Sequence, residues 1–399
     1  MVSKFLSAAI MALAAACSGA VAVGAAEPPY PPSDYITKMT LDWATYRRDA
    51  QEADNWHTTW ASDGKLYSSW GDGGGLGAGA EKISVSIGLA RLSGSTAASV
   101  TGQNLVGGLS PSLAKCFPSL GLAMERRARG KHVAFPCVGQ GLHAKSWSLL
   151  ALDRTLYMFV SPGSTTKGYE EARLVKAPLG SAKFAKADWA FRRTDNVPLL
   201  HPNLAQAGRN LADSAHVYAY ATRYAPFKDY GLHKGPGNAG EIHLLRAAKG
   251  ADLMRRESWE FYAGSPGSWT RSQSGSRAVI LDPNAVGWNT SAIYDKGLGR
   301  WLVSTQHEDR SAGKIGIFEA PEPYGPWRTV YYETLSNAEK DVPPRSYYAA
   351  FLANSFAEGG SRFTLTFTGG DVLDSLNLVD GRFTLNAGAK DRATGGGRP

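Results

Sequence analysis

The chain has 399 residues, of which 43% are hydrophobic, 20% charged and 11% aromatic, so it is not wholly disordered and has room for one large domain or two small ones. The net charge of +8 is spread over scattered basic residues with only short clusters such as Arg126 and Arg127, so we expect no nucleic-acid partner. Forty-five glycines and eleven tryptophans disfavour a helical bundle and favour an all-β protein rich in turns.

The N-terminus is typical of an export signal. Lys4 supplies a positive charge, an apolar run extends from Phe5 to Ala16, and small residues continue up to Ala26. We therefore predict a signal peptide at residues 1–26 and a secreted or periplasmic protein. Lipidation at Cys17 is the alternative, although the preceding alanines form a poor lipobox; without a lipid we expect no membrane partner.

Two cysteines, Cys116 and Cys137, remain after the signal is removed. In an exported chain they most simply form one disulfide that closes the loop of residues 117–136. Two buried free thiols are the alternative.

The rest of the chain repeats one plan, in which a polar strand, a turn and an apolar strand with an aromatic residue follow one another. The marker aromatics of the five clearest units are spaced by 61 to 90 residues, which accommodates one propeller blade and its loops: Tyr67, Tyr157, Tyr218, Trp301 and Phe363. We therefore predict a single-domain, five-bladed β-propeller at residues 27–386.

Three segments lie outside this plan. Ile36–Trp43 is expected to add a strand to the last blade and so close the ring, which hides an exposed sheet edge. Leu92–Ser112 is rich in small residues and is expected to be a long loop. Residues 387–399 lack an apolar pattern and are expected to be a disordered tail.

The first unit carries two aspartates, Asp54 and Asp72, on either side of a predicted hairpin turn at Asp63-Gly64. Because a hairpin reverses the chain, both carboxylates should lie at the same end of the blade. Two carboxylates at one end of a channel suit glycoside hydrolysis, in which one donates a proton and the other acts as base or nucleophile. Alternatively, both are turn or strand-end residues that bond backbone amides.

Polar and aromatic side chains near these strands are candidate sugar contacts. Flat rings that a sugar would stack against are offered by Trp56, Trp60 and Trp70. The other candidates, for each of which an ordinary strand or backbone role stays open, are Asn55, His57, His143, Lys145, Gln206, Asn210, Asn289 and Asn354. The histidines show no close ligand spacing, and nothing in the sequence requires a metal or another cofactor.

The order of several motifs resembles one family over most of the mature chain. Asp54-Asn55-Trp56, Thr59-Trp60, the Asp-Gly turn, Leu66-Tyr67 and Gly71-Asp72-Gly73 are similar to the opening blade of secreted five-bladed propellers that are endo-D-arabinanases, formerly a domain of unknown function. Later segments that also fit are Gln206–Asn210, Trp259–Gly264, Leu298–Trp301 and Gly316–Pro323.

This resemblance implies that Asp54 and Asp72 are the two essential aspartates and that the partner is a polysaccharide, D-arabinan first. We expect a monomer. The alternatives are a glycosidase acting on another polymer, such as an L-arabinan or a fructan, and a propeller that binds carbohydrate without cleaving it.

Overall fold

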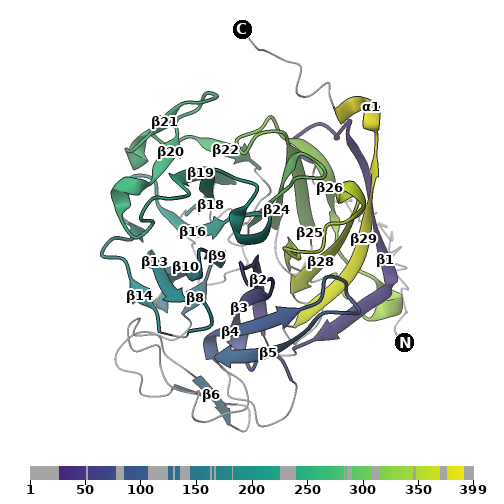
Figure 1. Cartoon of the computed structure of the whole chain (residues 1–399), viewed down its shortest axis with the longest axis horizontal. Coiled ribbons are helices and arrows are strands. Elements are labelled where there is room, and N and C mark those ends of the chain that lie inside the picture. The colour runs from purple at the N-terminus through teal and green to yellow at the C-terminus, as the bar shows by residue number, and fades with distance from the viewer. Residues whose placement is uncertain are drawn as a thin grey trace, which may run out of the picture.

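The computed structural model describes residues 27–50, 53–77, 85–106, 125–128, 131–134, 144–161, 164–165, 168–181, 183–224, 240–282, 284, 290–306, 314–344, 347–368 and 375–390. In this part of the chain the regular secondary structure is almost entirely β-strand, arranged as five blades around a central axis (Figure 1). The predicted all-β, five-bladed propeller is confirmed.

Each blade is built on an antiparallel sheet, and in blades 1 to 3 the innermost strand comes first in the chain. Blade 1 contains β2 (Asp54–Trp60), β3 (Leu66–Gly73), β4 (Val85–Ser93) and β5 (Thr101–Val106). Blade 2 contains β8 (Lys145–Ser146), β9 (Leu150–Leu152), β10 (Thr155–Ser161), β13 (Glu171–Pro178), β14 (Ala185–Lys186) and β15 (Phe191–Arg192). Blade 3 contains β16 (Leu199–Leu204), β18 (His216–Arg223), β19 (Glu241–Ala248), β20 (Glu260–Tyr262), β21 (Trp269–Thr270) and β22 (Ala278–Leu281).

Blade 4 contains β23 (Ser291–Asp295), β24 (Arg300–Gln306), β25 (Lys314–Ala320) and β26 (Arg328–Thr334), and the short β17 (Gln206–Ala207) pairs with β23 in parallel. Blade 5 contains β27 (Tyr347–Phe351), β28 (Arg362–Thr368), β29 (Leu376–Leu385) and β1 (Ile36–Asp49). Two small hairpins stand apart from the blades: β6 (Glu125–Ala128) with β7 (Lys131–Ala134), and β11 (Ser164–Thr165) with β12 (Gly168–Tyr169).

The ring is closed by its first strand. β1 pairs antiparallel with β29, from Ile36 opposite Leu385 to Asp49 opposite Leu376, and the two lie side by side in Figure 1. This confirms the expected closure, with a strand six residues longer than the predicted Ile36–Trp43. Because β1 covers the last blade's outer edge with the other end of the chain, the ring cannot open without breaking this pairing.

Two boundaries differ from the sequence-based expectations. The expected loop at residues 92–112 contains the end of β4 and all of β5, an outer strand that pairs through its backbone and needs few apolar side chains. The expected tail begins with a short helix, α1 (Ala387–Lys390), and residues 391–399 lie outside the described part.

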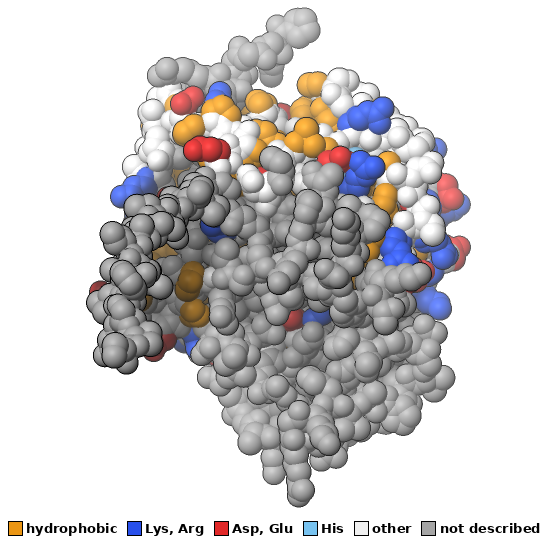
Figure 2. Space-filling view, turned by 180° about the vertical axis from the view of Figure 1, so that it is seen from behind, with side chains coloured by type: hydrophobic (Ala, Val, Ile, Leu, Met, Phe, Trp, Pro, Cys, Tyr) orange, Lys and Arg blue, Asp and Glu red, His pale blue; other side chains and the backbone are white. Residues whose placement is uncertain are grey.

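Apolar side chains fill the spaces between neighbouring blades. One cluster joins blades 1 and 5, and another joins blades 3 and 4, so each blade is stabilised by its neighbours rather than by a core of its own. On the face shown in Figure 2, described side chains of both charge signs are mixed with hydrophobic ones. That mixture agrees with the scattered charges of the sequence.

Candidate functional site

A β-bulge lies at the start of β2, the innermost strand of blade 1. Asp54 pairs with Gly71 and His57 pairs with Ser69. An advance of three residues along β2 therefore corresponds to an advance of two residues along β3, which leaves one extra residue in β2. Asn55, inside the bulge, has a left-handed φ of 54°, which asparagine tolerates better than most residues. The extra residue puts Asp54 and His57 on the same side of β2, whereas a regular strand would place them on opposite sides.

The contacts of β2 agree with this geometry. The Asp54 carboxylate meets the Lys145 ammonium of blade 2, and His57 Nε2 lies 3.2 Å from the Ser146 carbonyl oxygen of the same blade. In contrast, Thr58 Oγ1 accepts a 3.4 Å hydrogen bond from the Ala353 amide next to blade 5. The bulge therefore turns Asp54 towards blade 2.

Asp54 is buried and surrounded by hydrogen-bond donors. Lys145 Nζ lies 3.2 Å from Oδ2 and 3.4 Å from Oδ1, and Asn55 Nδ2 donates to Oδ1 over 3.1 Å. Asp54 is 5% exposed and Lys145 is 3% exposed, so the pair is removed from bulk water. Asn55 and Lys145, predicted to contact a sugar, instead support the carboxylate.

Position 72 lies at the same end of the blade as Asp54. The predicted turn at Asp63-Gly64 is confirmed: Gly64 has a φ of 78°, and Asp63 Oδ1 accepts from the Lys65 amide over 3.0 Å. Since Asp54 is opposite Gly71, the backbone of Asp72 follows directly on β3. The side chain of Asp72 lies outside the described part of the structure.

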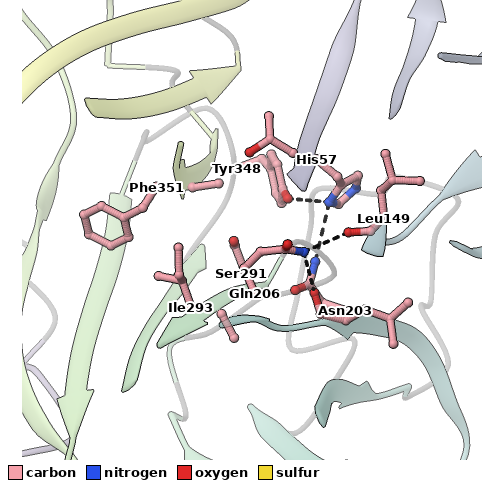
Figure 3. Close-up of a pocket in the computed structure, with 12 residues that line it drawn as sticks. His57, Leu149, Asn203, Gln206, Ser291, Ile293, Tyr348 and Phe351 are labelled. Atoms are coloured by element: carbon pink, nitrogen blue, oxygen red, sulfur yellow. Dashed lines mark hydrogen bonds between the residues drawn. The ribbon is translucent and has the colours of Figure 1, made fainter. Parts of the chain in front are cut away.

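Polar groups from all five blades gather in what we call the axial cluster, and four of its members, His57, Asn203, Ser291 and Tyr348, are labelled in Figure 3. The cluster consists of His57, the Ser146 carbonyl, Asn203, Ser291 and Tyr348, from blades 1 to 5 in that order. The Tyr348 hydroxyl is hydrogen-bonded to His57 Nδ1, and Asn203 Nδ2 lies 3.5 Å from the same nitrogen. Ser291 lines the same site. Asn203 Nδ2 also donates to the Trp147 carbonyl over 3.1 Å.

The cluster fixes the tautomer of His57. A carbonyl oxygen only accepts, so Nε2 carries the hydrogen that points to Ser146, and Nδ1 accepts from Tyr348. Burial lowers the pKa of His57 to about 3, and burial raises the pKa of Tyr348 well above its usual range. Both side chains are therefore neutral near pH 7.

Tyr348 repeats the backbone geometry of Asn55. It has a left-handed φ of 47° inside a bulge where Tyr347 pairs with Thr368 and Ala350 with Thr366. A bulky residue in this conformation is strained and is retained where the surroundings fix it, often at functional sites. Here the strain turns the phenol towards His57.

A small cavity of about 10 Å³, room for about one water molecule, lies at the axial cluster. Its polar lining comes from His57, Asn203, Gln206, Ser291 and Tyr348. Gln206, predicted to face the channel, does so, with its Nε2 donating to the Leu149 carbonyl over 2.8 Å. The lining thus mixes these polar side chains with apolar ones, among them Ile293 and Phe351.

The aromatic residues predicted to stack against a sugar do not fit that role. Trp56 is 1% exposed and Trp70 is 0% exposed; their ring centres are 5.7 Å apart in the core between blades 1 and 5. Trp60 is partly buried at the far end of β2, six residues and about 20 Å from Asp54. The prediction was wrong because alternation along a strand does not show which face is covered by the neighbouring blade.

Two of the predicted asparagines connect blades instead of facing the channel. Asn210 accepts from the Asp153 amide over 2.9 Å at an exposed position, and Asn354 Nδ2 donates to the Gly94 carbonyl over 3.0 Å. His143 and Asn289 lie outside the described residues, as do Cys17 and the signal peptide, and the predicted disulfide of Cys116 with Cys137.

A second polar network lies in blade 3. Arg223 Nη1 donates to both oxygens of Glu241 over 3.0 Å, Glu241 Oε2 lies 3.2 Å from His243 Nε2, and His243 Nδ1 lies 2.7 Å from Ser276 Oγ. Ser276 and His243 are each 3% exposed. The network ties β18, β19 and the segment before β22 together within one blade, so we interpret it as a structural link between these segments.

Sequence reasoning missed Asn203, Ser291 and Tyr348. Asn203 follows Pro202, which interrupts the alternating pattern of a strand, and Ser291 begins a strand two residues after Asn289, the residue chosen as the candidate. The one available signal for Tyr348 was its place in the repeat, since Tyr347-Tyr348 corresponds to Asp54-Asn55 at the start of an innermost strand.

Over the described ranges, no three or more His, Cys, Asp or Glu side chains gather into a group that could hold a metal ion. Nor is any helix there long and apolar enough to cross a membrane.

No protein-family model matches the sequence, and no curated protein matches it. Solved structures similar to this chain include the α-L-arabinofuranosidase PaAbf62A from Podospora anserina in complex with cellotriose, at 9% identity over 83% of this chain and 91% of that chain, with a TM-score of 0.41. The GH43_1 enzyme from Xanthomonas citri is 12% identical over 84% and 91%, with a TM-score of 0.43. An endo-1,4-β-xylanase from Bacteroides thetaiotaomicron has the same identity, coverage and TM-score. At these values the likeness carries no argument about chemistry, which has to come from this chain's own residues.

Proposed function

We propose that this protein is an exported glycoside hydrolase that cleaves furanosidic linkages in a polysaccharide, with D-arabinan as its substrate. Asp54 and Asp72 are the two carboxyl groups of the reaction. The observation that carries the proposal is the position of Asp54: a buried aspartate at the start of the innermost strand of blade 1, turned by the bulge towards Lys145.

The chemistry of glycoside hydrolysis fits this position. Cleavage needs one carboxylic acid to protonate the leaving oxygen and one carboxylate to act as base or nucleophile. The register of β2 and β3 supports a pair, because the backbone of Asp72 follows the partner of Asp54 on the neighbouring strand. A separation of about 5 Å between the carboxyl groups would give retention of the anomeric configuration, and about 6.5–9.5 Å would give inversion.

The choice of D-arabinan rests on the sequence motifs that resemble endo-D-arabinanases, above all Asp54-Asn55-Trp56 and Gly71-Asp72-Gly73. The predicted export signal agrees with this choice, since a polysaccharide is met outside the cytoplasm.

The test is product release from D-arabinan, L-arabinan and levan by the mature protein, beside its Asp72→Asn variant. Oligosaccharides from D-arabinan with the native protein alone are the expected result. Release from another polymer would keep the mechanism and replace the substrate. Binding without release from any polymer would overturn the hydrolase and favour a carbohydrate-binding propeller.

A further inference from the structure

Lys145 is the residue that most directly controls the charge of Asp54. Its ammonium lies within 3.4 Å of both carboxylate oxygens, and the side chains are 3% and 8% exposed. Lys145 stands at the start of β8, in the neighbouring blade, so the pair also fixes the two innermost strands against each other.

Burial strengthens the coupling of the two charges. Away from water a carboxylate is unfavourable unless an opposite charge and hydrogen-bond donors compensate it. Asp54 has both, since Lys145 supplies the charge and Asn55 Nδ2 supplies a further hydrogen bond of 3.1 Å. Donors stabilise the ionised form of a carboxyl group and disfavour its protonated form.

We propose that Lys145 is a positioning residue that holds Asp54 ionised, and that Asp54 is therefore the base or nucleophile of the reaction and not its proton donor. The inference rests on the proposed hydrolase function and leaves proton donation to Asp72. It also replaces the sugar contact predicted for Lys145, whose ammonium is directed at Asp54.

The proton balance follows from this assignment. If Asp54 is the base, it takes a proton from water as the water oxygen bonds to the anomeric carbon, the glycosidic C–O bond breaks, and Asp72 protonates the leaving oxygen. If Asp54 is the nucleophile, its oxygen bonds to the anomeric carbon while Asp72 protonates the leaving oxygen. Water then cleaves that ester and returns a proton to Asp72. Lys145 stays protonated in both courses.

The first experiment compares Lys145→Gln, which removes the charge, with Lys145→Arg, which keeps it. For Lys145→Gln on D-arabinan we expect kcat to fall about tenfold or more and KM to change little, because the residue acts on a catalytic group and not on the sugar. The acid limb of the kcat profile should move to higher pH, and Lys145→Arg should restore it. Lys186→Gln, the same change at an exposed position in blade 2, is the control and should match the native protein.

An unchanged acid limb in folded Lys145→Gln would overturn the proposal, as would a rise in KM without a loss in kcat. Circular dichroism and a melting curve establish that each variant is folded.

A second measurement does not depend on Lys145 variants folding. A nitrophenyl glycoside of a D-arabinofuranose oligosaccharide has a leaving group that needs no proton. Asp72→Asn should therefore retain much of the native rate of nitrophenol release in the first turnover, whereas Asp54→Asn should lose it. The opposite pattern would assign proton donation to Asp54 and overturn the proposal. If the native protein releases nothing from either substrate, the hydrolase function itself fails, which is distinguishable from a wrong assignment within an active enzyme.

Discussion

The axial cluster allows a sharp prediction at Tyr348. Replacing Tyr348 with Phe removes the hydroxyl that donates to His57 Nδ1 and leaves the rings in place. His57 Nε2 keeps its bond to the Ser146 carbonyl, but the other donor near Nδ1, Asn203 Nδ2, is 3.5 Å away, at the outer limit of a hydrogen bond. A buried acceptor left without a full partner costs about 1–3 kcal/mol.

We therefore expect Tyr348→Phe to lower the free energy of unfolding by about 1–3 kcal/mol, measured by urea unfolding at pH 7. The matched control is Tyr324→Phe, at a half-buried tyrosine whose hydroxyl makes no hydrogen bond to the residues that the structure describes, and it should change stability by less than about 0.5 kcal/mol. If both variants unfold at the same urea concentration, the cluster does not join the blades and this reasoning is wrong.

Two further predictions concern pH and packing. Burial lowers the pKa of His57 and of His201 to about 3, while the unfolded chain titrates near 6.5, so only the unfolded state gains protons between these values. The free energy of unfolding should have its full value above pH 6.5 and fall as the pH drops from 6.5 to 3, by up to about 1.4 kcal/mol per pH unit for each histidine. Urea midpoints that stay constant from pH 7 to pH 4 would contradict this. In blade 1, a Cβ at Gly88 would overlap the Trp70 ring, so Gly88→Ala should destabilise by about 1–3 kcal/mol in thermal melts, whereas Gly250→Ala, with open space around it, should not. Equal melting temperatures for Gly88→Ala and the native protein would show that the Trp70 ring moves aside and that this prediction is wrong.

The repeat pattern and the hairpin turn were predictable because they depend on local chemistry. Strand alternation, Asp63-Gly64 and the spacing of the marker aromatics each reflect a preference that a few neighbouring residues express. The closing strand β1 was also predictable, since a five-unit ring with one uncovered edge requires it.

The details of the site were not predictable for a physical reason. Which side of β2 faces blade 2 depends on a bulge at Asn55, and a single inserted residue reverses every side chain before it. The bulge therefore turns Asp54 towards Lys145 of another blade. That contact joins residues 91 positions apart, which no local pattern encodes.

The most direct test of the central claim compares turnover and binding of D-arabinan by the native protein and by Asp54→Asn. The substitution keeps the size of the side chain and removes its charge. We expect the variant to release no oligosaccharides, while its affinity for the polymer stays within a few-fold of the native value. Turnover that survives in Asp54→Asn would show that Asp54 is a structural residue and that the proposed chemistry is wrong.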